Sequence, residues 1–256
     1  MEELKYNDAG GVSKEKLTAV GMILGGLAIY FVTIFGTSLL LTGIIASIFD
    51  LNTVEGTANY INTIGIISEA LIIIWAGWLL KKHGYLNLTV SDVRGTLSKN
   101  LLWLIVILVA FLYAESILSV LIGGLLNAEG AVQQQSGVVI GGNPLLSILN
   151  IIVFAPLAEE IVYRLIHFNG WISLVMMFMG MVMCVVYEKT GSLIYPIILH
   201  MINNAVSMFS MYLGVGLIIS ESNVVNTLLF VAAACLTGFG CTKLKKGRSA
   251  SEDLVV

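Results

Sequence analysis

Charged side chains are scarce in this sequence. Of its 256 residues, 11% are Asp, Glu, Lys or Arg and 57% are hydrophobic, whereas a typical soluble domain carries about 25% charged residues. The mean hydropathy of +0.94 agrees with this composition. An ordinary soluble domain is therefore excluded, and a polytopic membrane protein is indicated. The formal net charge of −3 and the lack of a basic face argue against a nucleic-acid partner.

Cysteine is also scarce, and several catalytic motifs are missing. Cys184, Cys235 and Cys241 are too few and too scattered for a disulfide framework or a cysteine-based zinc site. The sequence has no HExxH pair, no GxSxG segment, and no aspartate within its apolar stretches. It therefore offers no established zinc spacing, no serine nucleophile and no aspartate dyad. We expect no cofactor and no bound metal.

Seven long apolar stretches organise the chain, and about 20 apolar residues suffice to cross a bilayer as a helix. The predicted spans are residues 17–49, 61–80, 101–126, 144–166, 171–187, 192–219 and 224–239. The predicted fold class is thus an all-α polytopic transmembrane helix bundle.

The bundle is expected to be one domain. We predict a single helical domain at 17–240, with its catalytic-type half at 144–219, between a cytoplasmic lead at 1–16 and a cytoplasmic tail at 241–256. The lead is polar and partly acidic, unlike a cleaved signal peptide.

Basic residues predict how the spans are oriented. The connector after the second span carries Lys81, Lys82, Arg94 and Lys99, and the tail carries a second basic run from Lys243. The positive-inside rule places both segments in the cytoplasm. With the connector in the cytoplasm after two spans, the N-terminus lies there too. The N-terminus and the tail on one side require an even number of spans, whereas the sequence shows seven. One span is therefore misread or absent.

The most informative stretch is APLAEEIVYR, which ends at Arg164. An ionised side chain at membrane depth costs roughly 2.5–3.5 kcal/mol on insertion scales. Such residues are usually retained for a function, so Glu159 and Glu160 indicate a functional site. On a helix, Glu160 and Arg164 lie about 40° apart, with His167 near the same line. Arg164 would hold one of the two carboxylates ionised, which suits a general base that takes a proton from water. A structural ion pair is the alternative.

His200 and Asn204 lie four positions apart in the sixth span, on one helix face. A histidine within lipid is a functional hypothesis by default. Asn204 could orient His200 or donate a hydrogen bond to an oxyanion, and the pair could equally join two helices. For Glu69 and Glu115, single carboxylates in the second and third spans, we favour a structural role.

Metal chemistry is the competing interpretation of these residues. His167, His200 and Glu160 could form a three-ligand zinc site. Nothing in their spacing matches an established zinc motif.

These residues resemble the CPBP family, which joins type II CAAX prenyl endopeptidases to bacteriocin-processing and self-immunity membrane proteins. Its first motif, EExxxR, is matched by Glu159, Glu160 and Arg164, and its third, HxxxN, by His200 and Asn204. The stretch GMVMCVVYEKTGSLIYPIILHMINN resembles the last block of the family. The similarity covers about residues 145–210.

The resemblance implies an eight-span bundle around a membrane-embedded cavity. It also implies that Glu160 or Glu159 is the base and Arg164 fixes the carboxylates. His167 would help position the water, and His200 with Asn204 would hold the developing charge.

The second motif of the family is FxxxH, and His167 in LIHFN resembles its end. The chain departs from the family between the first motif and this second one. His167 follows Glu160 by only seven positions, where the family has an entire helix. One span is therefore expected to be missing there. With the remaining spans inserted in turn, His200 is expected to approach from the wrong side of the membrane and activity to be weakened.

The leading function predicted from the sequence is an intramembrane, metal-independent glutamate endopeptidase. Its expected partners are the lipid bilayer and a membrane-associated peptide or protein substrate, with no nucleic acid. The expected location is a bacterial cell membrane. The alternatives are a non-catalytic bacteriocin self-immunity or scaffold protein, and a small proton-coupled transporter. A Glu160→Gln variant would separate the endopeptidase from the scaffold, which should tolerate the loss of ionisation. Proton-coupled flux in liposomes would support the transporter.

Overall fold

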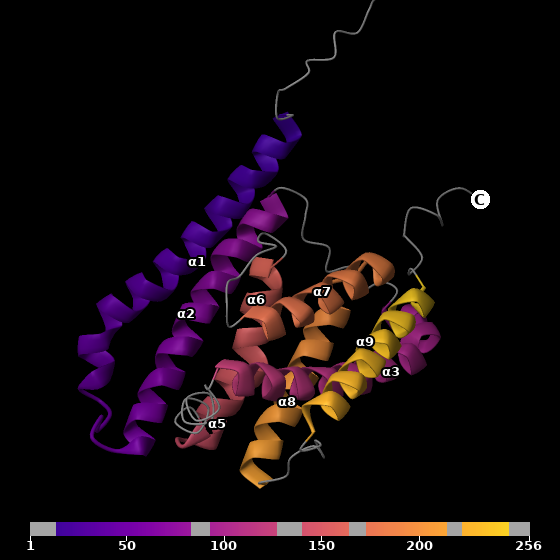
Figure 1. Ribbon diagram of the computed structural model, residues 1–256. Coiled ribbons are helices and arrows are strands. Elements are labelled where there is room, and N and C mark those ends of the chain that lie inside the picture. Colours follow the sequence, from indigo (N-terminus) through magenta and orange to yellow (C-terminus); the bar gives the residue numbers. More distant parts are fainter. Residues whose placement is uncertain (1–13, 83–92, 127–139, 164–172, 214–221, 246–256) are drawn as a thin grey trace, which may run out of the picture.

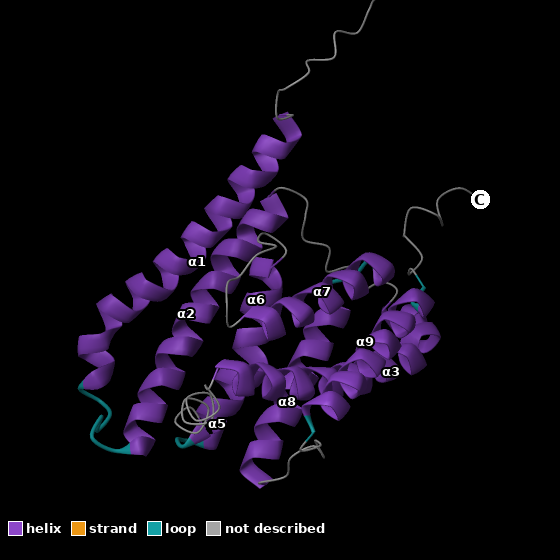
Figure 2. Ribbon diagram, in the orientation of Figure 1, coloured by secondary structure: helices purple, strands orange, loops and turns teal. Residues whose placement is uncertain are grey.

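The computed structural model describes residues 14–82, 93–126, 140–163, 173–213 and 222–245. These residues are helical or form short loops, and none of them is in a strand (Figure 2). The helices are α1 (Lys14–Ala46), α2 (Val54–Lys82), α3 (Val93–Leu126), α5 (Pro144–Ser147), the π-helix η1 (Ile148–Phe154), α6 (Ala155–Tyr163), α7 (Ser173–Thr190), α8 (Ile194–Leu213) and α9 (Asn223–Lys243).

The predicted spans correspond to these helices, with α5, η1 and α6 forming the fourth as one continuous helical segment. Within the described residues, five helical stretches are long and apolar enough to cross a membrane: 54–78, 97–122, 144–161, 194–213 and 223–243. In α1, the stretch Tyr30–Ala46 is apolar but shorter. The predicted all-α polytopic bundle is confirmed.

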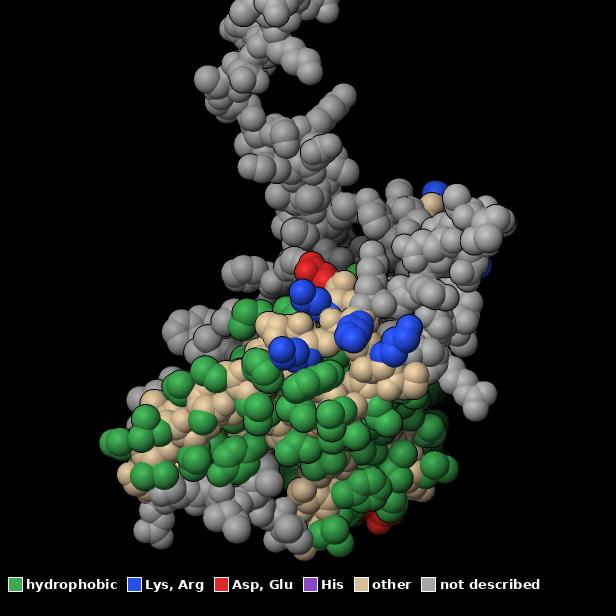
Figure 3. All heavy atoms as spheres, turned by 90° about the vertical axis from the view of Figure 1, so that its right-hand side faces the viewer, with side chains coloured by type: hydrophobic (Ala, Val, Ile, Leu, Met, Phe, Trp, Pro, Cys, Tyr) green, Lys and Arg blue, Asp and Glu red, His purple; other side chains and the backbone are tan. Residues whose placement is uncertain are grey.

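The outer surface of the bundle is apolar. Large hydrophobic side chains are exposed on several helices, among them Leu39 on α1, Leu213 on α8 and Val224 on α9. Figure 3 shows one such face, where hydrophobic side chains form a broad surface and Lys or Arg side chains gather along its upper rim. A surface this apolar is suited to lipid rather than water, with the basic rim at a membrane–water boundary.

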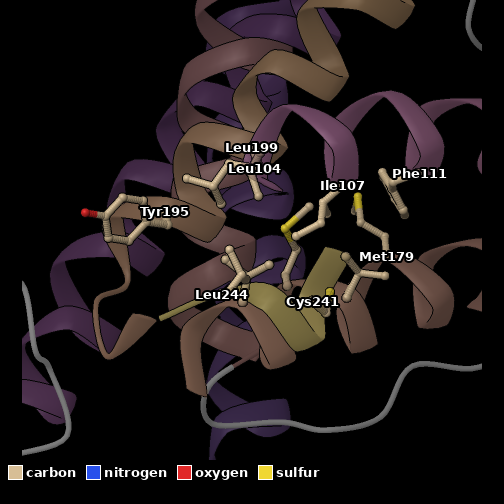
Figure 4. Close-up of a cluster of buried hydrophobic side chains, with 11 residues drawn as sticks. Leu104, Ile107, Phe111, Met179, Tyr195, Leu199, Cys241 and Leu244 are labelled. Atoms are coloured by element: carbon tan, nitrogen blue, oxygen red, sulfur yellow. The ribbon is translucent and has the colours of Figure 1, made fainter. Parts of the chain in front are cut away.

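Helix α8 lies at the centre of the packing. Its residues Tyr195 and Leu199 pack with Leu104 of α3, Met179 of α7 and the end of α9 in one buried cluster (Figure 4). A second buried cluster joins α8 to two other helices through Ile197, with Ile72 of α2 and Ala158 of α6. The side chains of α8 thus reach both halves of the bundle, so a polar residue between these faces is enclosed.

The contacts also fix the direction in which each helix runs. Moving up α8, Glu160 contacts His200, the carbonyl of Ile151 contacts Asn204, and the carbonyl of Ile140 contacts Tyr212. Helix α8 is therefore antiparallel to the α5–η1–α6 segment. Because α6 ends and α8 begins at the same end of the bundle, the chain makes no net crossing between Tyr163 and Ile194. In Figure 1, α7 lies oblique to α2 and α8.

This arrangement corrects one prediction. The expectation that His200 approaches from the wrong side of the membrane is wrong, since His200 contacts Glu160 directly. That expectation treated every apolar helix as a full crossing of the bilayer. The odd count of spans disappears for the same reason, because a helix with no net crossing leaves an even number. The basic connector and the basic tail can then share one side.

A line of polar side chains, buried at Asn62, Ser147 and Asn150, joins α2 to the start of the α5–η1–α6 segment. Asn62 donates a hydrogen bond from Nδ2 to Ser147 Oγ at 3.2 Å and accepts one at Oδ1 from Asn150 Nδ2 at 2.9 Å. Asn59 Oδ1 accepts the backbone N–H of Asn143 at 2.6 Å. In a bilayer such groups are retained where they pair with one another. Gly65 makes room for Asn150, because a Cβ there would lie 2.6 Å from Asn150 Oδ1.

We predict that Gly65→Ala destabilises the fold, because the added methyl group would collide with the enclosed Asn150 amide. The expected cost is about 1–3 kcal/mol, as for overpacking in a dense core. Gly77→Ala on the same helix is the matched control, since nothing lies within 4 Å of its added Cβ. That variant should be neutral or slightly more stable, because alanine favours a helix. Unfolding in detergent micelles measures both, and equal stability of the two variants would contradict the contact.

The helix directions predict a labelling pattern. In a cysteine-free background, single cysteines at Lys82 and Lys245 should both react with an impermeant maleimide from the cytoplasmic side. Asn52 and Ser222, at the opposite ends of α2 and α9, should react only from the other side. Lys245 lies with the start of α3 because its backbone N–H and carbonyl bond to Asn100, each at 2.8 Å. Labelling of positions 82 and 245 from opposite sides would contradict the even number of crossings.

Candidate active site

A buried imidazole lies between two carboxylates at the centre of the bundle. His200 Nδ1 is 3.2 Å from Oε1 of Glu160, and His200 Nε2 is 3.6 Å from Oε2 of Glu159. Glu160 and His200 are each only 1% exposed. Glu159 retains 23% of its side-chain surface. Both ring nitrogens therefore face an acid, and Glu159 is the acid with the more accessible side chain.

Local sequence explains how two adjacent glutamates reach one ring. Consecutive helical residues point about 100° apart, so Glu159 and Glu160 approach His200 from two directions rather than side by side. The imidazole of His200 lies between them. His200 thus contacts two carboxylates that are adjacent in the chain.

Two further carboxylates surround this group. Glu69 of α2 is close enough to Glu159 to interact with it electrostatically. Glu115 of α3 interacts with His200 and forms a hydrogen bond with Asn203 of α8. We predicted a structural role for both glutamates; the structure brings them to the edge of the site, and their role stays a prediction. A charged residue in an apolar span was the signal, but no spacing links Glu69 or Glu115 to the motifs.

Several buried oxygens around the site have no hydrogen-bond partner within the described chain. They are Ser68 Oγ, Glu69 Oε2, Asn150 Oδ1, Glu159 Oε2 and Asn203 Oδ1. Each unpaired polar group in a bilayer interior is costly. Their concentration on α2, η1, α6 and α8 indicates a site that can bind water or polar groups of a ligand. Sequence reasoning missed Asn150 and Asn203, which look like ordinary helix-joining residues.

The remaining predicted site residues are found in different circumstances. Asn204 is half-buried, and its Nδ2 donates to the backbone carbonyl of Ile151 at 2.9 Å. Arg164 and His167 lie outside the described residues, so their predicted roles stay predictions. Within the described chain, no three His, Cys, Asp or Glu side chains form a group that could hold a metal ion. The zinc alternative also involves His167 and therefore stays a prediction.

We predict that Glu160→Ala destabilises the fold more than Glu159→Ala. The first change leaves the buried His200 Nδ1 without its partner, at a cost of about 1–3 kcal/mol. The second removes a longer contact from a more exposed side chain, so its cost should be smaller. Denaturant unfolding in micelles at one pH compares the two. A larger loss of stability for Glu159→Ala would show that Glu159, rather than Glu160, holds the imidazole.

Comparison with known proteins adds one finding. Residues 165–206 match the family described as type II CAAX prenyl endopeptidase Rce1-like. The match includes His200 and Asn204 and ends shortly after them. No curated protein and no solved structure matched the chain. The predicted resemblance is thereby confirmed: over this segment the chain is similar to the type II CAAX prenyl endopeptidases of the Rce1-like family.

Proposed function

We propose that this chain is an intramembrane endopeptidase of the CAAX protease type. It would hydrolyse a peptide bond of a membrane-associated substrate in the membrane of a bacterial cell. One observation carries the proposal: a buried imidazole has a carboxylate at each ring nitrogen, inside an apolar bundle. The similarity to the CAAX endopeptidase family supports it independently.

The unequal exposure of the two acids suggests how they divide the work. Glu159 has the more accessible side chain of the two acids, and its buried Oε2 forms no hydrogen bond within the described chain, so it acts as the general base. As the water oxygen attacks the carbonyl carbon, Glu159 takes the water proton and later gives it to the leaving amine nitrogen. Glu160 accepts a hydrogen bond from Nδ1–H of His200, and the imidazolium form of the ring donates its Nε2–H to the oxyanion.

The other motif residues keep the roles that the resemblance implies. Arg164 fixes the carboxylates, His167 helps position the water, and Asn204 assists His200. A buried base is effective here because few waters compete with substrate in an apolar bundle.

A proton-coupled transporter is a second candidate, favoured by Glu69 and Glu115. Glu69 on α2 and Glu115 on α3 lie beside the residues around His200, so titratable side chains continue from the site to these two helices. Buried acids of this kind relay protons in pumps. Proton flux in liposomes without peptide cleavage would support this candidate instead. A scaffold or immunity role would be supported if its activity in cells survived the loss of both glutamates.

We predict that purified chain in liposomes cleaves a quenched fluorescent peptide that carries a lipidated cysteine followed by three C-terminal residues. Glu159→Gln should reduce cleavage about 10²-fold or more, because glutamine cannot accept a proton. Glu160→Gln should also reduce it, through loss of the charge beside Nδ1 of His200. Glu188→Gln is the control, since Glu188 is exposed at the end of α7.

Two outcomes would contradict the proposal. Unchanged cleavage in Glu159→Gln would remove the assigned base. Loss of cleavage after treatment with a chelator, restored by zinc, would support the metal alternative, because a glutamate-activated water needs no metal ion. The unlipidated peptide, run in parallel, reports whether the lipid is recognised.

A further inference from the structure

The π-helix before the glutamates contains a backbone carbonyl that the helix itself does not bind. In η1, the N–H of Ala155 donates to the carbonyl of Asn150, five residues earlier. The same pattern would pair the carbonyl of Ile151 with the N–H of residue 156. That residue is Pro156, which has no backbone N–H. Both N–H groups that could have bound Ile151 are therefore excluded, one by its own bond to Asn150 and the other by proline.

Asn204 supplies the missing donor. Its Nδ2 lies 2.9 Å from the Ile151 carbonyl oxygen. A π-helical turn within an α-helix is uncommon and occurs often at functional sites. Here the π-helical turn determines which carbonyl lacks a hydrogen bond because of Pro156. It is the carbonyl of Ile151, which faces α8. In a bilayer interior, an unpaired carbonyl costs enough to make such a bond specific.

This bond lies one helical turn from His200. Asn204 follows His200 by four residues on the same face of α8. Ile151 precedes the glutamates along the same continuous helical segment. One hydrogen bond thus fixes the register of α8 against the segment that carries Glu159 and Glu160. A shift of either helix would separate His200 Nδ1 from Glu160, which now lies 3.2 Å away.

We propose that Asn204 is a positioning residue for His200, and that it acts through the Ile151 carbonyl left unpaired by Pro156. The catalytic meaning of this role rests on the proposed function, but the role itself concerns the geometry of the imidazole. It is separate from the role in oxyanion binding that the resemblance implies for Asn204, because one of the two Nδ2 hydrogens is directed to the backbone of η1.

The first test is a double-mutant cycle on stability, which needs no activity. Asn204→Leu should lower the melting temperature in micelles by about 2–8 °C, as expected for loss of one buried hydrogen bond. Pro156→Ala restores a backbone N–H, so Ile151 no longer depends on Asn204. In the Pro156→Ala background, Asn204→Leu should therefore cost less than half as much. Equal losses in both backgrounds would overturn the proposal.

Asn226→Leu is the control for this cycle. Asn226 is buried on α9, which packs against α3 and α7 rather than η1. Its effect should be the same with Pro156 and with alanine at that position. A dependence on residue 156 as strong as that of Asn204 would mean that Pro156→Ala disturbs the whole bundle, and would overturn the specific link.

The second test observes His200 directly and does not require Pro156→Ala to fold. In protein labelled with ¹⁵N-histidine, the ring signals of His200 are assigned from their loss in His200→Gln. Asn204→Leu should shift these signals, because the bond between Nδ1 and Glu160 is disturbed. Unchanged His200 signals in a folded Asn204→Leu variant would overturn the positioning role. Failure of peptide cleavage with both results as expected would instead count against the proposed function alone.

Discussion

The site depends on the contact between His200 and Glu160. Both side chains are almost fully enclosed, in a region where a lone ionised group would be costly. Glu160 and the imidazole of His200 therefore stabilise each other. The positions of the surrounding helices matter because they keep these two side chains together. Breaking a buried pair leaves a group without a partner, which is more damaging than never having placed the pair there. The remaining polar groups on α2 and η1 lie around this contact.

The fold creates the contact by using α8 as a shared element. The apolar faces of α8 pack against both halves of the bundle, and His200 lies between those faces. Because α8 runs antiparallel to the α5–η1–α6 segment, each turn of one helix meets a defined turn of the other. Apolar side chains alone could not fix one unique register between these two helices. The hydrogen bond from Asn204 to the π-helical turn adds a polar contact that does. The position of the imidazole therefore depends on a hydrogen bond to the backbone one helical turn away.

Much of this molecule can be predicted from its sequence, for identifiable reasons. Apolar stretches of about 20 residues define membrane helices because lipid cannot satisfy an irregular backbone. Glu159, Glu160 and His200 are recognisable because charged groups in such stretches are costly. Helix direction was mispredicted, because counting spans treats α7 as a full crossing. The position of Glu69 and Glu115 at the edge of the site could not be predicted, because spacing within one helix does not reveal which neighbouring helix a side chain faces. The hydrogen bond between Asn204 and the Ile151 carbonyl joins residues that are 53 positions apart, which local sequence cannot show.

The most direct test of this account is the distance between His200 and Glu160 in a lipid bilayer. Solid-state NMR can measure the dipolar coupling between ¹⁵Nδ1 of His200 and the ¹³C carboxyl of Glu160 in selectively labelled protein. The account predicts a strong coupling, as expected for a direct hydrogen bond across 3.2 Å. Absence of any coupling, in protein that is folded and embedded in lipid, would contradict the site described here.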